Sequence, residues 1–128
     1  MTLVLLDTNF LMVPEQFGID IFSEIERIVP ECELVTLKSV ILELEKIREH
    51  AGKGRDKIAA DVALKLIEKF NEKIKIVESS GNVDEFILKF SAENNAIVCT
   101  NDKKLKKRLK KEGIRVIQMR GKSRLEFL

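Results

Sequence analysis

The hydrophobic and polar positions of the chain form two alternating patterns. Short, mainly apolar runs are typical of buried strands, and such runs occur at residues 3–6, 34–36, 74–77, 96–100 and 114–117. Apolar residues spaced by three or four positions predict helices, and they fill most of the sequence between these runs. The pattern therefore predicts five strands that alternate with helices.

The helical segments have recognisable ends. One apolar stripe covers residues 17–28 and stops before a proline, and the next covers residues 37–47. Residues 50–55 are the best candidate for a loop, and Asp56 is expected to begin the helix after it. Asn82 is expected to cap a later helix.

Strands that alternate with helices favour a parallel sheet covered on both faces. We therefore expect an α/β fold, a three-layer α/β/α sandwich around a central parallel sheet of about five strands. The sequence has no internal repeat and no linker, so residues 1–128 are expected to form a single domain. A basic C-terminal tail is expected from about residue 119.

The net charge of +2 conceals an uneven distribution. Residues 103–128 carry 11 of the 23 basic residues and two of the 21 acids, a net charge of +9, which leaves −7 on residues 1–102. An acidic body with a basic end suits a protein that holds cations beside a polyanion.

Other features of the composition exclude several classes of site. Cys32 and Cys99 lack metal-ligand spacing and are expected to be buried thiols, and the single histidine, His50, excludes a multi-histidine metal site. Met1 leads directly into a strand-like run, so no signal peptide is expected. No apolar run approaches the ~20 residues of a membrane span. We expect a cytoplasmic protein without a membrane partner.

Two acids follow predicted strands at the edge where open parallel sheets bind ligands. Asp7 comes directly after the first strand, and Asp102 comes after the fourth strand and the pair Thr100-Asn101. Each acid also has a purely structural explanation, because Asp7 could form an Asx turn and Asp102 could cap the next helix.

Two further acids lie on predicted helices. Glu43 falls within the apolar stripe of residues 37–47, where an acid rarely stands without a partner. Asp84 lies in the first turn of its helix, where the helix dipole alone favours a negative charge. Four carboxylates gathered at one sheet edge would repel each other unless a cation neutralised them. Ligands that are all oxygens select hard cations such as Mg²⁺ or Mn²⁺, which promote phosphodiester hydrolysis.

Four short motifs resemble, in order, those of PIN-domain nucleases. They are Asp7-Thr8-Asn9, Glu43 within Val40–Leu44, Asp84 ahead of Phe86-Ile87, and Val98–Asp102. The resemblance extends from residue 3 to about residue 118. It implies a metal-dependent endoribonuclease in which Mg²⁺ or Mn²⁺ is held by the catalytic acids Asp7, Glu43, Asp84 and Asp102. It also implies that the site is shaped by Thr8, Asn9, Thr100 and Asn101.

The resemblance leaves two branches of the family open. The Gly52–Arg55 segment and the Thr100–Lys106 segment are more similar to PIN endonucleases that mature small-subunit ribosomal RNA, so a role in rRNA processing is expected. The alternative is a toxin of the VapC type. The expected partners are RNA and either an antitoxin or a ribosome-assembly protein, and a homodimer is left open.

Basic residues crowd the segment after Asp102. Phosphate contacts are expected from Lys103, Lys104, Lys107 and Lys111, with Arg55 on a second patch. The structural alternative is a solvated charged face. No aromatic residue stands among these lysines, so base stacking is not indicated there.

Rival functions lack their defining residues. A phosphatase of the haloacid dehalogenase type needs a second Asp two residues after the first, and Asn9 holds that position. A phospho-receiver domain needs an acidic pair, a central acceptor Asp and a late Lys, and a Rossmann or P-loop protein needs its glycine motif. A PIN-like fold kept as a non-catalytic RNA-binding or assembly module is the remaining alternative.

Overall fold

The computed structural model describes residues 1–50 and 54–128. Along the chain the elements are β1 (Thr2–Leu6), α1 (Thr8–Leu11), α2 (Val13–Phe17), α3 (Ile21–Ile28), β2 (Cys32–Leu37), α4 (Lys38–His50), α5 (Gly54–Lys69), β3 (Ile74–Val77), α6 (Val83–Asn94), β4 (Ile97–Cys99), α7 (Lys103–Lys111), β5 (Val116–Arg120) and β6 (Arg124–Phe127).

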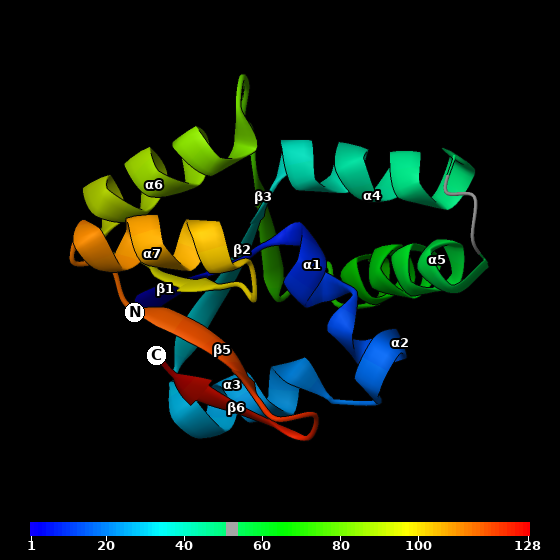
Figure 1. Ribbon diagram of the computed structural model, residues 1–128, viewed down its shortest axis with the longest axis horizontal. Coiled ribbons are helices and arrows are strands. Elements are labelled where there is room, and N and C mark those ends of the chain that lie inside the picture. The colour runs from blue at the N-terminus through cyan, green and yellow to red at the C-terminus, as the bar shows by residue number, and fades with distance from the viewer. Residues whose placement is uncertain (51–53) are drawn as a thin grey trace.

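The strands form one sheet in the order β3-β2-β1-β4-β5-β6. All neighbouring pairs are parallel except β5 and β6, which are antiparallel. The helix α6 lies beside α7, and α3 lies against β6, so that helices flank the sheet on opposite sides (Figure 1). The predicted α/β/α sandwich is confirmed, with six strands instead of about five.

The burial of each strand follows its place in the sheet. The central strand β1 has neighbours on both sides, and its residues Val4, Leu5 and Leu6 are fully buried. The edge strand β3 exposes its two middle residues, Lys75 and Ile76. Continuous apolar runs are thus confined to strands covered on both faces.

Three sequence predictions about helices and loops need correction. The stripe at residues 17–28 is not one helix, because Gly18 adopts a left-handed conformation (φ 66°) that ends α2, and α3 begins at Ile21. His50 belongs to α4, so the predicted loop of residues 50–55 begins too early. The next helix, α5, begins at Gly54 and not at Asp56 as predicted. Residues 51–53 of the predicted loop lie outside the described residues.

The segment predicted as a basic tail from about residue 119 is a hairpin. Strand β5 continues to Arg120, Gly121 turns the chain with a positive φ of 59°, and β6 returns beside it. Leu125 is buried, and two residues of α3 hold it: its N–H donates to Glu24 (3.0 Å) and its carbonyl accepts from Arg27 (3.1 Å). The terminal strand is therefore fastened to α3.

The two cysteine thiols differ in burial. Cys99 is buried as predicted, but Cys32 is only half-buried because it begins the β2 strand at the rim of the sheet. In the described part of the chain, no helix combines the length and the apolar character that a membrane span requires.

Candidate functional site

The carboxyl ends of β1 and β4 meet at the point where the sheet changes direction. From β1 the chain builds β2 and β3 on one side, and it then returns to place β4 and β5 on the other. Leu6 pairs with Cys99, and the Asp7 N–H donates to the Cys99 carbonyl at 3.1 Å. Asp7 and Thr100 therefore lie next to each other at the place where open sheets bind ligands.

Asp7 is an acid held in the protein interior, with 7% of its surface exposed. Its Oδ1 accepts the Thr8 N–H at 2.8 Å, and its Oδ2 accepts the Thr100 hydroxyl at 2.8 Å. Burial raises the pKa of Asp7 to about 6, although these two hydrogen bonds oppose the rise. The negative charges of Asp84 and Glu43 raise the pKa further. The carboxylate is thus fixed in position and costly to ionise without a cation.

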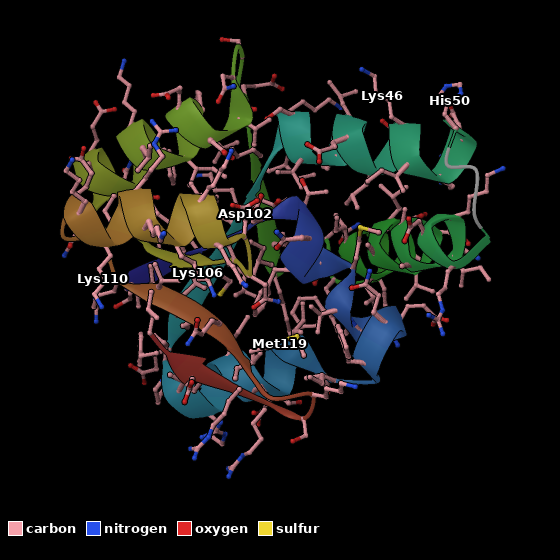
Figure 2. The ribbon with its side chains drawn as sticks, in the orientation of Figure 1. Lys46, His50, Asp102, Lys106, Lys110 and Met119 are labelled. Atoms are coloured by element: carbon pink, nitrogen blue, oxygen red, sulfur yellow. The ribbon has the colours of Figure 1, made fainter. Side chains whose placement is uncertain are left out.

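The Thr100 hydroxyl connects Asp7 to Asp102. It is fully buried, donates to Asp7 and accepts the Asp102 N–H at 3.1 Å. Asp102 caps α7, because its Oδ1 accepts the Leu105 N–H at 2.8 Å, and its side chain is exposed at the start of that helix (Figure 2). The capping explanation raised from the sequence is therefore realised, and it leaves Oδ2 without a hydrogen-bond donor in the described residues.

Two asparagines hold the loop that follows β4. The Asn101 N–H donates to Asn9 Oδ1 at 3.3 Å, and Asn101 Oδ1 accepts the Met119 N–H at 2.9 Å. The loop that carries Asp102 is consequently tied to α1 on one side and to β5 on the other. Thr8 is buried, and its hydroxyl has no hydrogen-bond partner in the described ranges.

Glu43 does not lie on the core-facing stripe that the sequence predicted. Val40 and Leu44 take the buried positions of α4, and Glu43 stands on the flank with its side chain exposed. Partial removal of water nevertheless raises the pKa of Glu43, and the charge of Asp84 raises it as well. The nearby Thr8 hydroxyl and the charge of Lys46 act in the opposite direction.

Asp84 lies half-buried in the first turn of α6. Burial is the main cause of its raised pKa, followed by the charge of Asp102, while Arg108 opposes the rise. The four predicted acids thus form a chain of electrostatic neighbours that links Asp7 to Glu43 and Asp84, and Asp84 to Asp102.

Two carboxylates can shift each other's pKa at distances too long for both to bind one metal ion. Within residues 1–50 and 54–128, no three Asp, Glu, His or Cys side chains stand close enough together to hold an ion. The chemistry of the donors nevertheless fits a hard cation, since each one offers carboxylate oxygen. A buried Asp7 with a raised pKa is a group that a cation would stabilise in its charged form.

Sequence reasoning missed the cation that lies beside Glu43. Lys46 is on the same helix three residues further on, and such a spacing places two side chains on one face. Glu43 and Lys46 line one hollow of about 470 Å³. Figure 2 shows Lys46 and His50 on the same face of α4. The spacing was visible in the sequence, but only the structure shows that this face borders the acids.

Some basic residues of α7 have protein partners, and others are exposed without an ion pair in the described residues. Lys106 donates to Gln118 at 2.9 Å, and Arg108 forms an ion pair with Glu85 on α6. The side chains proposed as phosphate contacts are all exposed and form no ion pair in the described part of the chain: Lys103, Lys104, Lys107 and Lys111. Arg55 lies apart from them, in the first turn of α5.

Comparison with known proteins identifies relatives over nearly the whole chain. Residues 4–122 match a family described as PIN like domain. The chain is 38% identical to ribonuclease VapC4 of Methanocaldococcus jannaschii, over 94% of this chain and 92% of that protein. It is 36% identical to ribonuclease VapC9 of Archaeoglobus fulgidus, over 86% of this chain and 77% of that protein.

Solved structures are also similar to this chain over nearly its whole length. The PIN domain endonuclease Utp24 is similar with a TM-score of 0.75 and 27% identity, over 98% of this chain and 92% of that chain. A domain of a functionally unknown protein from Methanocaldococcus jannaschii shares the fold, with a TM-score of 0.63 and 23% identity.

Proposed function

The chain belongs to the PIN-like domain family, and from this membership we propose that it is an endoribonuclease that hydrolyses RNA phosphodiester bonds with the help of Mg²⁺ or Mn²⁺. The observation that carries the proposal is the buried Asp7 carboxylate, clamped by Thr100 and within electrostatic range of Glu43 and Asp84. The ribonuclease relatives support the hydrolytic activity.

We propose that the cation is held by Asp7, Glu43, Asp84 and Asp102. When bound, such an ion activates water and stabilises negative charge on the phosphate. Asp7 contributes a fixed position because it follows a central strand and is held at both oxygens. Glu43 is exposed and can turn toward Asp7, whereas Asp102 keeps one oxygen for its cap and offers the other.

The surrounding residues position these acids and the RNA. Thr100 orients both Asp7 and Asp102, while Asn9 and Asn101 fix the loop between β4 and α7. The exposed lysines of α7 begin one residue after Asp102, so they are suited to hold the RNA backbone next to the acids. These contacts involve phosphate and are independent of sequence.

Two biological roles follow from different comparisons. Relatives named VapC ribonucleases favour a toxin, which would act with an antitoxin as partner. The Gly52–Arg55 and Thr100–Lys106 segments, which resemble those of PIN endonucleases that mature small-subunit ribosomal RNA, favour RNA maturation alongside ribosome-assembly proteins. Expression in a host that lacks any antitoxin distinguishes these roles, since a toxin arrests growth unless Asp7 is substituted.

The central experiment measures cleavage of single-stranded RNA by the purified chain. We expect cleavage with Mg²⁺ or Mn²⁺ and none in EDTA. Asp7→Asn should abolish cleavage but preserve RNA binding, because it removes a ligand oxygen and a negative charge without removing any lysine. Asp20→Asn is the matched control, because Asp20 caps α3, is not among the charges that shift the pKa of Asp7, Glu43 or Asp84, and can be replaced by asparagine as a helix cap.

Two results would overturn the metal mechanism. One is equal cleavage in EDTA and in Mg²⁺, and the other is wild-type activity in Asp7→Asn. Binding of RNA without cleavage in any divalent cation would instead favour the non-catalytic module.

A further inference from the structure

A wide hollow on the surface is lined by none of the four acids. It has a volume of about 830 Å³ and lies between the end of α2, the start of α5 and the turn between β5 and β6. Two large apolar side chains line it, Phe17 with 42% and Ile58 with 53% of their surfaces exposed. Two cations, Arg55 and Lys122, and two acids, Glu15 and Asp56, line it as well.

The aromatic ring in this hollow belongs to Phe17, which is held at the end of the short helix α2. Phe17 is the last residue of α2, and the next N–H, of Gly18, returns to the Pro14 carbonyl at 2.9 Å. The helix α2 packs against α5, as Figure 1 shows. Phe17 and Ile58 therefore expose apolar surface together in this hollow, where a flat ring can pack against it.

A second hollow leads from this one toward the acids. It holds about 470 Å³ and is lined by Glu43, Lys46 and His50 on α4, together with Asp56 on α5. Asp56 lines both hollows, so they adjoin. Seven residues separate Glu43 from His50 along α4, which corresponds to about 10 Å of helix. An extended strand that crosses Glu43 can therefore continue into the larger hollow.

We propose that the larger hollow binds an unstacked base of the single-stranded RNA, a short distance along the strand from the cleaved bond. The proposal rests on the ribonuclease function proposed above. Phe17 stacks against the base, while Gln16 and Asp56 offer donors and acceptors to its edge. Arg55 and Lys122 contact the flanking phosphates, and neither forms an ion pair within residues 1–50 and 54–128.

This assignment differs from the expectation drawn for the basic end of the chain. No aromatic residue stands near those lysines in the sequence, but folding brings Phe17 beside Arg55 and Lys122 from three distant segments. A protein segment is the other class of occupant for an apolar hollow. Arg55 and Lys122 form no ion pair with Glu15 or Asp56 within residues 1–50 and 54–128, and these available cations, with the continuity to Glu43, favour RNA.

The test compares the binding of short fluorescein-labelled oligo(A), oligo(C) and oligo(U) RNA, measured by anisotropy in EDTA. Phe17→Leu should weaken binding of at least one of these by about tenfold, because stacking is lost while apolar surface remains. Phe17→Trp, which keeps an aromatic ring at this position, should bind these RNAs with wild-type affinity. The matched control is Phe127→Leu, since Phe127 is a similarly exposed ring (41%) on β6.

The cations are tested in the same assay. Replacing Arg55 and Lys122 together by glutamine should weaken binding of all three RNAs severalfold. The control is Arg115→Gln, which changes an exposed cation that lines a different hollow.

The outcomes separate this proposal from the one on which it rests. Wild-type affinity in Phe17→Leu for all three RNAs overturns the base site, even if the protein cleaves RNA, and leaves the hollow to a protein partner. A wild-type chain that binds RNA but cuts none in any divalent cation overturns the nuclease function. A loss of affinity that is equal in Phe17→Leu and Phe127→Leu also overturns the base site, because the effect is then not local.

Discussion

Thr100 touches two of the proposed ligands with one hydroxyl group. It donates to the Asp7 carboxylate at 2.8 Å and accepts the Asp102 N–H at 3.1 Å, and its side chain is fully buried. A buried carboxylate that loses such a donor loses both orientation and solvation. At the scale of the residue, the geometry of the site therefore depends on a side chain that need not bind metal itself.

Thr100→Val should reduce cleavage at saturating RNA by tenfold or more, because Asp7 and Asp102 lose their common partner. The loss of a buried hydrogen bond should also cost about 1–3 kcal/mol of unfolding free energy. Steady-state cleavage rates and urea denaturation measure the two effects.

Thr100→Ser is the control for this change, since it keeps the hydroxyl and should keep most of the activity. Equal cleavage by the valine and serine variants would show that the hydroxyl has no role in positioning the acids.

At the scale of the element, the relative position of α4 and α6 depends on a bridge of two serines. The Ser39 N–H donates to Ser79 Oγ at 3.0 Å, and the two hydroxyls are 2.7 Å apart. Ser39 belongs to the first turn of α4, which carries Glu43, and Ser79 precedes α6, which carries Asp84. The bridge thus joins two elements whose acids interact electrostatically.

Ser79→Ala should lower both the cleavage rate and the free energy of unfolding. We expect a severalfold decrease in kcat with little change in KM, because the phosphate contacts on α7 are not altered. The loss in stability should be about 1–3 kcal/mol, because both hydrogen bonds to Ser39 are lost.

The adjacent, exposed Ser80 provides the control, since Ser80→Ala changes the same loop by the same atoms. A Ser79→Ala enzyme whose kcat matches that of Ser80→Ala would contradict the positioning role.

A second inter-element contact fastens β6 to α3 and depends on pH. The hydrogen bond from Arg27 is the main cause that lowers the pKa of Glu24 to about 2, and the Leu125 N–H is the second. A depressed pKa means that Glu24 stabilises the fold above its ordinary pKa of about 4.5. This stabilisation is lost as the pH falls from there toward 2.

Glu24→Gln should therefore melt at a lower temperature than the wild type at pH 7, and the difference should shrink at pH 3 and below. Hydrogen exchange at the Leu125 amide should accelerate in the variant at neutral pH, because its acceptor loses its charge. A difference in melting temperature that stays constant from pH 7 to pH 2 would refute the ionised clamp.

The sequence predicted the order of strands and helices well, because apolar runs and caps are local signals. The β5–β6 hairpin escaped prediction because its residues alternate charged and apolar over only a few positions and adjoin a strongly basic segment. Glu43 was placed on the wrong face because two positions of a helical stripe differ by only a small rotation. The hollow at Phe17 could not be predicted, since its lining comes from three segments that only folding joins.

At the scale of the whole molecule, charge is concentrated on one helix. The helix α7 begins next to Asp102 and carries seven basic residues and no acid, which is most of the net charge of +9 on residues 103–128. Single-stranded nucleic acid releases counterions when cations neutralise its phosphates, so affinity falls as salt rises.

Replacing Lys104, Lys107 and Lys111 together by glutamine should weaken RNA binding. It should also reduce the slope of log affinity against log salt by about 2, since each lost phosphate contact changes this slope by ~0.7. The rate at saturating RNA should change little. Anisotropy titrations between low and moderate salt measure the slope.

The charge-matched control replaces Lys69, Lys73 and Lys75, which are exposed near the opposite edge of the sheet. If both triple variants lower the slope equally, total charge governs binding and the α7 face does not.

The strand order has a consequence for the time at which the protein becomes active. Asp7 is synthesised before its partner Thr100, which comes 93 positions later, directly after the strand β4 that completes the centre of the sheet. A ribosome-bound chain that ends before β4 contains Asp7, Glu43 and Asp84, yet it lacks both Thr100 and Asp102. On the site proposed above, we therefore expect a nascent chain to cut no RNA until Thr100 and Asp102 have been added, while it remains within reach of the messenger and the ribosome that are producing it.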